Sequence, residues 1–458
     1  MPESIKYDEP GQCSGPIDIF GECMDRRNFV RVGVNGMFGL IAAQALSQQL
    51  AGAENGGGIL GSQADSCVLL WMNGGPSHID TFDPKPGRAT GGPVKSIATS
   101  VKGIEISEYF PQVADLAHHL AILRGIESRE GNHQRAQYLM HTGYIPNPTV
   151  SYPSIGSWVN KEIGDPNFDL PQFVSIRGPS VGAGFLGVAH APFVVQNPGQ
   201  PPNNIAYARG IDQLRFSERI KILDFMERGF ANRTADAKII GHDTTYTKAI
   251  RMMHTPLRKA FDISEEPNSV MSSYGIPSKD GDGNGRQRRA GRGSFGSGVL
   301  MARRLIETGV KFVEVVQSGW DTHQNNFERT KQLCDGVDPA FAQLIKDLRD
   351  RDRLEKTLII WMGEFGRTPR INDNEGRDHY PRAWSVVLAG GGIKGGQVIG
   401  GTNDEGAQSV GKPITVPDLF ASLCAALGMN PRKQYHTAQG RPIKITDNGK
   451  PIEYLFHG

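Results

Sequence analysis

The sequence predicts an α/β fold with a mostly parallel central sheet, helices on both faces and an inserted helical segment. Short apolar runs rich in β-branched residues recur along the chain, which is typical of strands buried in a parallel sheet. Amphipathic helical patterns separate these runs, and alternation at this spacing indicates a sheet that is covered on both faces. The chain has 458 residues, of which 38% are hydrophobic, and this is enough for a large core.

Six apolar runs that end at a turn or a polar loop are the expected strands: 67–72, 120–126, 172–176, 310–316, 357–362 and 384–389. Helical periodicity marks the expected helices: 111–119, 133–143, 154–163, 295–307, 339–351 and 416–427. The second helix ends at Thr142 and Gly143, and the last is closed by Gly428. Glycine is the usual residue at such helix ends because it tolerates the left-handed conformation.

The inserted segment lies between the third and fourth expected strands. Over about 211–263, apolar residues at helical spacing predict a helical insertion. Over about 264–292, turn-forming residues followed by arginines predict a flexible loop. Its tract 279–285, K-D-G-D-G-N-G, resembles part of a calcium-binding loop but lacks the glutamate that such a loop has at its twelfth position. A linker is therefore the better interpretation of this tract.

Residues 1–53 are expected to be a twin-arginine signal peptide. Arg26 and Arg27 precede a weakly apolar stretch, and the small residues at 51–53 offer a cleavage site. The rival interpretation is a membrane anchor, but the apolar stretch is shorter than the ~20 residues of a spanning helix. We therefore expect export to the periplasm or the medium and no transmembrane anchor after cleavage. A linker at 54–65 and a main domain at 66–458 would follow.

Charge and cysteine content argue against two classes of protein. Lys and Arg number 50 against 48 Asp and Glu, so no global field would hold nucleic acid. Three of the five cysteines follow the expected signal peptide, an odd number without metal-binding spacing, so no disulfide framework or zinc motif is expected. The sequence carries no signature of an oligomeric state.

Polar side chains gather in the loops that leave the expected strands, at 73–83, 130–135, 321–323, 364–370 and 377–379. Ligands of open α/β sheets bind beyond the carboxyl ends of the strands, so this distribution predicts a site at that edge. The alternative for the most charged stretch is a solvated loop with ion pairs. Gly363 and Gly366, which flank Glu364, favour a site.

The residue types in these loops suit a cation together with an anionic ester. Carboxylate and imidazole groups are ligands of Zn, Mn, Mg or Ca. Asp321 and His323 are two residues apart, so both point to one side of an extended chain, as two ligands of one ion would. Arginine forks match the oxygens of sulfate or phosphate.

Five stretches resemble a known family: C-V-L-L-W-M-N-G-G-P-S-H-I-D-T-F-D-P-K, E-G-N-H-Q-R-A-Q-Y-L-M-H-T-G, G-W-D-T-H, W-M-G-E-F-G-R-T-P and G-R-D-H-Y-P. They look like the exported family called domain of unknown function 1501, which is grouped with the alkaline phosphatase superfamily and its sulfatases. The resemblance runs from about residue 65 to the C-terminus. It implies an alkaline-phosphatase-like or sulfatase-like fold for the main domain.

One metal site of that superfamily corresponds to residues that this chain keeps. Asp321, His323 and His379 match its ligands, with Glu364 or Asp378 as a further ligand. We therefore expect one divalent cation, whether Zn, Mn, Ca or Mg, at these residues. The alternative is a hydrogen-bonded clasp of Asp and His side chains without a metal.

The second metal site of the superfamily is depleted. Asn73 stands in place of an aspartate, Phe365 in place of a histidine, and no hydroxyl or thiol stands at the position of the nucleophile. A single anionic ligand rarely holds a dication, so we expect no ion there, with Phe365 as a wall of the pocket. His78 and Asp80 are the candidate replacement ligands that would overturn this expectation.

The resemblance implies a metal-dependent hydrolase of sulfate or phosphate esters, with a polysaccharide as one candidate substrate. The candidate catalytic residues are His133 as general acid or base, Arg135 and Arg367 as holders of the anion, and Asn132, which would orient it. The candidate substrate contacts are Asn73, His78 and Arg377.

Two alternatives to this function and these roles stay open at the level of the sequence. The first is a degenerate member of the superfamily that binds a polysaccharide or a cell-surface partner without chemistry, and the missing nucleophile favours it. The second concerns His133 alone, which at the start of a helix is also a residue that hydrogen-bonds to backbone.

Overall fold

The computed structural model describes residues 64–200, 202, 207, 210–234, 247–277 and 294–456. The expected signal peptide and almost all of the expected linker lie outside the described residues, as does the tract 279–285. Within the described part of the chain, no helix is both long and apolar enough to cross a membrane.

The centre of the fold is a nine-stranded sheet in the order β12-β4-β11-β8-β1-β7-β5-β6, with β13 beside β4. Its strands are β1 (Ser66–Asn73), β4 (Leu120–Glu127), β5 (Phe173–Ile176), β6 (Phe193–Val195), β7 (Phe312–Ser318), β8 (Thr357–Met362), β11 (Trp384–Ala389), β12 (Gln397–Gly400) and β13 (Ile414–Thr415). Of these strands, only β11 runs antiparallel to its neighbours. The predicted mostly parallel sheet is confirmed.

The antiparallel direction of β11 has a consequence for the site. The first residue of β11, Trp384, pairs with Ile126 near the C-terminal end of β4. β11 therefore begins at the edge where β4, β8, β1 and β7 end. The chain that leads into it, including His379, lies at that edge together with the loops that leave the parallel strands.

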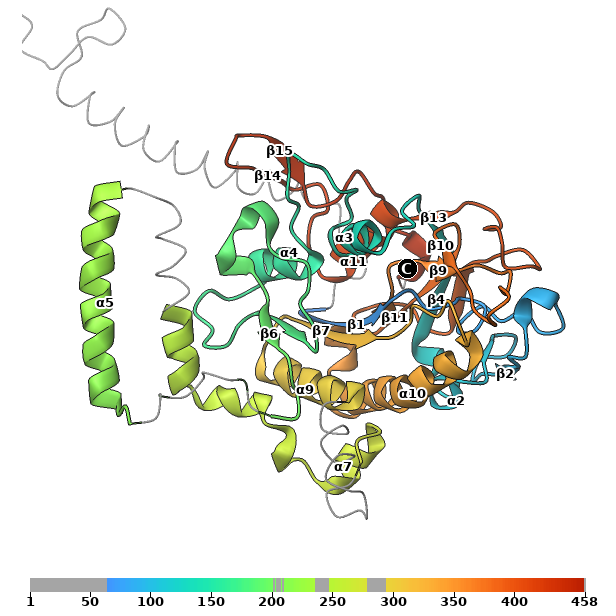
Figure 1. Cartoon of the computed structure of the whole chain (residues 1–458), viewed down its shortest axis with the longest axis horizontal. Coiled ribbons are helices and arrows are strands. Elements are labelled where there is room, and N and C mark those ends of the chain that lie inside the picture. The colour runs from blue at the N-terminus through green and yellow to red at the C-terminus, as the bar shows by residue number, and fades with distance from the viewer. Residues whose placement is uncertain are drawn as a thin grey trace, which may run out of the picture. The chain divides into compact units, whose positions relative to one another are not determined.

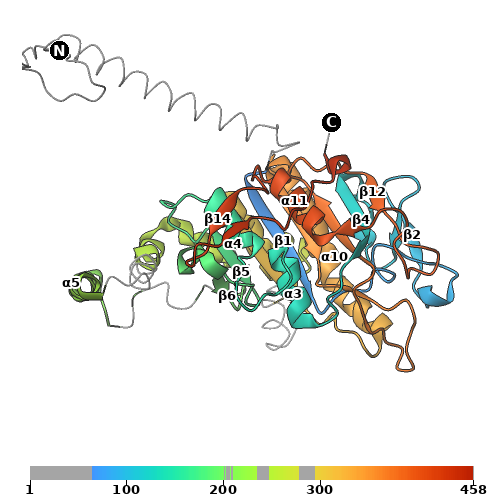
Figure 2. The same cartoon turned by 90° about the horizontal axis from the view of Figure 1, so that it is seen from above.

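Helices cover both faces of the sheet, as predicted (Figure 1). One face carries α2 (Pro111–Ala114), α9 (Phe295–Thr308) and α10 (Asn326–Asp350). The other carries α3 (His133–Thr142), α4 (Ile155–Glu162) and α11 (Val416–Ala426), and Figure 2 looks onto this face.

The side chains of β1 contribute alternately to the two halves of the core, one on each face of the sheet. Val68 and Leu70 pack on the face covered by α9 and α10, and Leu69 and Trp71 pack on the opposite face. Successive side chains of a strand point to opposite faces of the sheet. A strand that is apolar at every position therefore needs apolar cover on both faces.

The helices begin and end at residues suited to these positions. Asn132 caps α3 by accepting a hydrogen bond from the backbone N–H of Arg135, and Ser154 caps α4 in the same way. Gly143 ends α3 in the left-handed conformation. Side-chain caps satisfy the backbone donors that the first turn leaves free.

Two predicted boundaries differ from the structure. Helix α10 begins at Asn326, well before the predicted start at 339, and Pro339 lies inside it. Proline is commonest in the first turn of a helix, which is why the sequence predicts a start at this residue. The predicted loop at 264–292 contains α7 (Asn268–Ser273), with Met271 buried. A helix this short has too few residues to show periodicity.

The remaining described elements are one long helix and three small sheets. The predicted insertion contains α5 (Gln213–Thr234). Three two-stranded sheets pair β2 (Ser96–Ala98) with β3 (Glu105–Ser107), β9 (Gly366–Arg367) with β10 (His379–Tyr380), and β14 (Gln434–His436) with β15 (Pro442–Lys444). The three described cysteines, Cys67, Cys334 and Cys424, are buried free thiols.

Candidate metal centre

Four loops meet at the carboxyl edge of the sheet, and two glycines allow the closest approach between them. A Cβ atom on Gly74 would lie 2.4 Å from the backbone nitrogen of Asp321, and one on Gly75 would lie 2.8 Å from the carbonyl oxygen of Phe365. Both glycines have positive φ, +118° and +79°. Only a residue without a side chain lets the loop after β1 pack this tightly against its neighbours.

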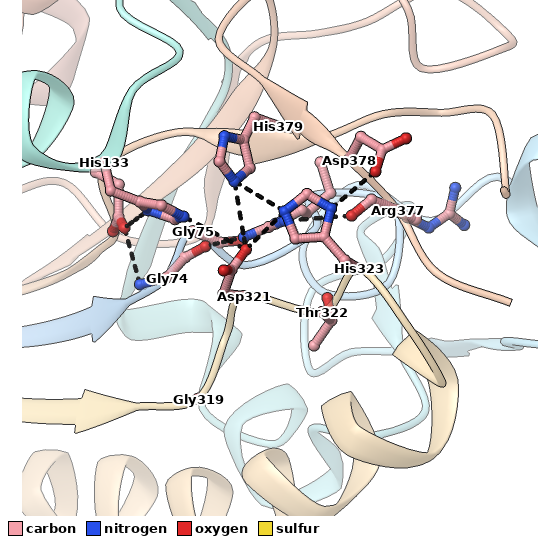
Figure 3. Close-up of polar contacts among 12 residues, drawn as sticks. Gly74, Gly75, His133, Gly319, Asp321, Thr322, His323, Arg377, Asp378 and His379 are labelled. Carbon is pink, nitrogen blue, oxygen red and sulfur yellow. Dashed lines mark hydrogen bonds and ion pairs between the residues drawn. The ribbon is translucent and has the colours of Figure 1, made fainter. Parts of the chain in front are cut away.

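The carboxylate of Asp321 is the centre of a cluster of imidazoles (Figure 3). Its Oδ1 atom lies 3.1 Å from Nε2 of His323, 3.3 Å from Nε2 of His379 and 3.4 Å from Nε2 of His133. The ligand atoms of His133, Asp321 and His379 all lie within 4.8 Å of one another. Two nitrogens and one oxygen therefore converge on one small volume, and Nε2 of His323 lies beside them, 3.0 Å from Nε2 of His379.

The other nitrogen of each imidazole faces an acceptor. Nδ1 of His133 lies 2.8 Å from Oε1 of Glu364, and Nδ1 of His323 lies 2.7 Å from Oδ1 of Asp378. Nδ1 of His379 lies 2.9 Å from the carbonyl oxygen of Gly131. In a neutral ring the proton therefore sits on Nδ1 and is donated to this acceptor, which leaves the Nε2 lone pair directed at the cluster.

This donor set fits a divalent cation. Nε2 of His323 and Nε2 of His379 lie 3.0 Å apart, and with both rings neutral two lone pairs face each other across this gap. A cation between them removes that repulsion, and carboxylate or carbonyl partners on the far nitrogens are the usual support of histidine ligands. Imidazole with carboxylate suits Zn²⁺ or Mn²⁺ better than Ca²⁺ or Mg²⁺, which prefer oxygen ligands.

The pKa values of the cluster reflect these contacts. Partial burial by itself would raise the pKa of Asp321, but the hydrogen bond and charge of Arg367 lower it to about 2. Burial, aided by the charge of Arg367, lowers the pKa of His379. Asp321 is thus anionic and His379 neutral, the forms in which both bind metals. The hydrogen bond to Glu364 raises the pKa of His133, so at this ring a metal ion competes with a proton.

Arg367 is fully buried beside Asp321. Its Nη2 atom donates to Oδ1 of Asp321 at 2.6 Å and to the carbonyl oxygen of Gly74. Its Nε atom donates to the carbonyl of Gly75 at 2.9 Å, and Nη1 donates to the carbonyl of Arg377 at 3.2 Å. The sequence suggested that Arg367 holds an anionic substrate, but the structure uses its donors to join three loops and to orient Asp321.

Arg377 is a second fully buried arginine, and its placement disagrees with the expected substrate contact. Its guanidinium pairs with the buried carboxylate of Asp80, at 2.7 Å from Nε to Oδ2 and 3.0 Å from Nη2 to Oδ1. The ion pair with Arg377 also occupies Asp80, which was a candidate replacement ligand for a second ion. In the sequence, Arg377 has the residue type and the loop position of an arginine that binds substrate. Only its burial in the structure distinguishes a structural role from a substrate-binding one.

Glu364 and Asp378 were expected to be further ligands, and the structure places each behind an imidazole instead. Oε1 of Glu364 accepts hydrogen bonds from His133 and from the backbone N–H of Gly74, at 2.9 Å for the latter. The hydrogen bond from His323 lowers the pKa of Asp378. His133, predicted as a general acid or base, takes the place beside Asp321 that was expected for a carboxylate.

The other predicted residues lie at or beyond the rim of the cluster. Asn132 is exposed and caps α3, and the exposed Arg135 pairs with Glu130 at 2.6 Å. Asn73 is half-buried and accepts a weak hydrogen bond from Trp71 at 3.4 Å. His78 is fully buried, with Nε2 at 2.8 Å from the carbonyl oxygen of Gly406, so it is not a substrate contact in this structure.

The sequence did not reveal His133 as a candidate ligand. The available signal was its position at the first turn of a helix, next to the capping Asn132, in one of the polar strand-leaving loops. Phe365, expected to wall the pocket, is buried with its ring centroid 5.0 Å from that of His133 and 4.7 Å from that of His379. Its ring therefore packs beside both imidazoles, as expected for a wall of the pocket.

A family model described as "Protein of unknown function (DUF1501)" matches residues 64–456. No curated protein matches the sequence. The sulfatase PsFucS1 from Pseudoalteromonas sp. is similar over 94% of this chain and 80% of its own, at 13% identity and a TM-score of 0.36.

Two further solved structures are similar to a comparable extent. The lipoteichoic acid synthase LtaP from Listeria monocytogenes is similar over 85% of this chain and 77% of its own, at 9% identity and a TM-score of 0.37. The alkaline phosphatase from the Antarctic bacterium TAB5 is similar over 75% and 96%, at 14% identity and a TM-score of 0.28. Likenesses this weak carry no conclusion about substrate or reaction.

Proposed function

The chain belongs to the DUF1501 family, and from this premise we propose that it is a hydrolase of sulfate or phosphate esters that depends on one divalent cation. The convergence of three Nε2 atoms on Oδ1 of Asp321 is the observation that carries the proposal. Each of these nitrogens is turned inward by an acceptor on the far side of its ring. Without a metal, a hydrogen-bonded cluster of these side chains would need a proton on one of the two Nε2 atoms of His323 and His379 that face each other.

The cation would be held by His133, Asp321, His323 and His379. When bound, it would supply a Lewis acid that polarises an ester oxygen and lowers the pKa of a water molecule. The cluster is open to substrate from one side, because the side chains of Asp321 and His323 are 46% and 41% exposed. An anionic ester can therefore approach without a large rearrangement.

The surrounding residues hold this arrangement in place. Glu364 and Asp378 keep the Nδ1 protons of His133 and His323 in place, which fixes the tautomer and the orientation of both rings. Arg367 holds Asp321 ionised. The exposed Asn132 and Arg135 at the start of α3 and the half-buried Asn73 remain the candidates for contacts to the anion.

In the described part of the chain, the lack of a nucleophilic side chain in contact with the cluster favours direct attack by water over a covalent intermediate. Among the described residues, no serine, threonine or cysteine side chain makes a polar contact with His133, Asp321, His323 or His379. The same observation favours the second candidate function, a binding protein for an anionic polysaccharide. Export through the twin-arginine route is part of the proposal and would place either function outside the cytoplasm.

The experiment is a panel of aryl sulfates, phosphomonoesters and phosphodiesters assayed with Zn²⁺ and Mn²⁺. Wild-type protein is expected to turn over at least one ester class, and Asp321→Ala is expected to lose this activity. Asp335→Ala is the matched control, because Asp335 is an exposed aspartate on α10 that pairs with Lys331. No turnover by the wild type would favour the binding protein, and equal turnover by Asp321→Ala would exclude this site.

A further inference from the structure

Asp80 is a completely buried carboxylate that contacts none of the candidate ligands. It lies in the loop that follows β1, and three hydrogen bonds reach it from two distant segments. Arg377 donates from Nε at 2.7 Å and from Nη2 at 3.0 Å, and Asn326 donates from Nδ2 at 2.8 Å. Arg377 lies two residues before His379, and Asn326 lies three residues after His323, so one carboxylate joins three loops of the site.

Both partners of Asp80 also hold Thr322, the residue between Asp321 and His323. The hydroxyl of Thr322 donates to Oδ1 of Asn326 at 2.6 Å. The backbone N–H of Arg377 donates to the carbonyl oxygen of Thr322 at 3.0 Å. The segment with Asp321 and His323 is thus fixed against the segment with Asp378 and His379 through atoms that Asp80 orients.

The network leaves Arg377 no free donor for a substrate. Besides Asp80, its guanidinium donates to the carbonyl oxygens of Thr90 at 2.7 Å, Thr368 at 3.1 Å and Pro369 at 2.5 Å. A buried charge pair whose donors are all satisfied has one favourable arrangement, and removing either member leaves the other charge unpaired in the interior. Such a pair fixes geometry more firmly than an exposed pair would.

We propose that Asp80 is a positioning residue that sets the spacing between the two ligand-bearing loops. Through Arg377 and Asn326 it holds the 3.0 Å approach of Nε2 of His323 to Nε2 of His379. The consequence for metal affinity rests on the proposed function, whereas the positioning of the loops does not depend on it.

Hydrogen–deuterium exchange on the full chain without added metal tests the positioning directly. Asp80→Asn keeps the shape of the side chain but leaves Arg377 without its counter-charge. We expect amide exchange to become faster in both 320–324 and 376–380, with little change in the strands of the sheet. Unchanged exchange in both segments would overturn the proposal.

Asp347→Asn is the matched control. Asp347 is another largely buried aspartate paired with an arginine, accepting from Tyr274 at 2.8 Å and lying 3.3 Å from Nε of Arg303. We expect this variant to lose stability without faster exchange in the two loops. If amide exchange in the two loops became equally fast in Asp347→Asn, Asp80 would be only a general stabilising residue. This result would overturn the proposal.

A second variant decides the matter if Asp80→Asn does not fold. Asn326→Ala keeps the buried ion pair and removes the link from Asp80 to Thr322, together with a weak hydrogen bond from Thr330 at 3.4 Å. Faster exchange is therefore expected in 320–324 and not in 376–380. Unchanged exchange in 320–324 would contradict the proposal.

Titration with Zn²⁺ then separates this inference from the proposed function. If the wild type binds Zn²⁺, Asp80→Asn should bind it roughly tenfold more weakly, as expected for a residue that supports ligands, and Asp347→Asn should match the wild type. If the wild type binds none, the proposed function fails while the exchange data still decide the positioning.

Discussion

Nε2 of His323 and Nε2 of His379 face each other at 3.0 Å, although Nδ1 of each ring already lies against an acceptor. Without a cation one of the two rings must carry a second proton. With a cation both rings stay neutral and both Nδ1 hydrogen bonds are kept. This relationship is the structural basis of the proposed metal site.

We expect one equivalent of divalent cation per chain, measured by elemental analysis after incubation with Zn²⁺ or Mn²⁺ and dialysis. A second site would have Glu364 as its single anionic ligand, because Asn73 is neutral and the carboxylate of Asp80 is paired with Arg377. His78 has its Nε2 atom against the carbonyl of Gly406 and is not free to replace a ligand. Two equivalents, or none, would contradict the prediction.

Glu364→Gln should weaken metal binding by roughly 10–100-fold, the usual effect of removing a partner behind a histidine ligand. The glutamine keeps the shape of the side chain but lacks the charge that holds the Nδ1 proton of His133. Calorimetric titration with Zn²⁺ measures the change. Glu130→Gln is the control, since Glu130 pairs with Arg135 at the exposed end of α3; an equal loss in both variants would count against the assigned role.

Arg367→Lys should destabilise the protein by about 3 kcal/mol, as removal of one partner from a buried charged network does. A lysine cannot reproduce the fork that reaches Asp321 together with the carbonyls of Gly75 and Arg377. Urea unfolding measures the free energy. Arg135→Lys, at an exposed ion pair, should leave it almost unchanged. If Arg367→Lys and Arg135→Lys had equal free energies of unfolding, Arg367 would again be a candidate for substrate binding.

Gly74→Ala should destabilise the protein far more than Gly87→Ala. Both glycines have positive φ, so an alanine at either position costs roughly 1–2 kcal/mol of backbone strain. At Gly74 the new Cβ atom would also lie 2.4 Å from the backbone nitrogen of Asp321, whereas nothing lies within 4 Å at Gly87. Comparison of the melting temperatures of the two variants separates the cost of backbone strain from the cost of the steric clash with Asp321. Similar melting temperatures would show that the loop after β1 can move away from Asp321 at no cost.

The buried pair of His141 and Glu314 should make stability fall at alkaline pH. Burial by itself would lower the pKa of His141, but the charge and hydrogen bond of Glu314, 3.1 Å from Nε2, raise it above the ordinary value. A raised pKa in the folded state means that the pair stabilises the fold fully below the unfolded value of about 6.5. This contribution is lost as pH rises through the folded value.

Urea unfolding of the wild type and of His141→Gln between pH 6 and pH 9 measures this contribution. The variant should lack the part of the alkaline decline that the wild type shows. His118→Gln, which replaces an exposed histidine bonded to Ser100, is the control and should follow the wild type. A wild-type stability that rises with pH over this interval would show that the sign is wrong.

Much of the fold could be predicted because its signals are local. The run 67–72 is apolar at every position, and it forms β1 with both faces buried. The periodicity of 295–307 and of 416–427 likewise predicted α9 and α11 to within a residue or two. The antiparallel direction of β11 was not predictable, because it depends on pairing with β4, more than two hundred residues away in the chain.

The sequence by itself determined which residue types stand in the loops at the edge of the sheet, and with the family resemblance it predicted that Asp321, His323 and His379 lie together, as they do in the structure. Only the tertiary structure decided which polar atom meets which. His133, rather than a carboxylate, lies beside Asp321, and Glu364 lies behind it. Arg377 is joined to Asp80 across 297 positions of the chain and is closed to substrate. Strand and helix periodicity is a property of neighbouring residues, whereas a hydrogen bond forms between whichever groups the fold brings within about 3 Å.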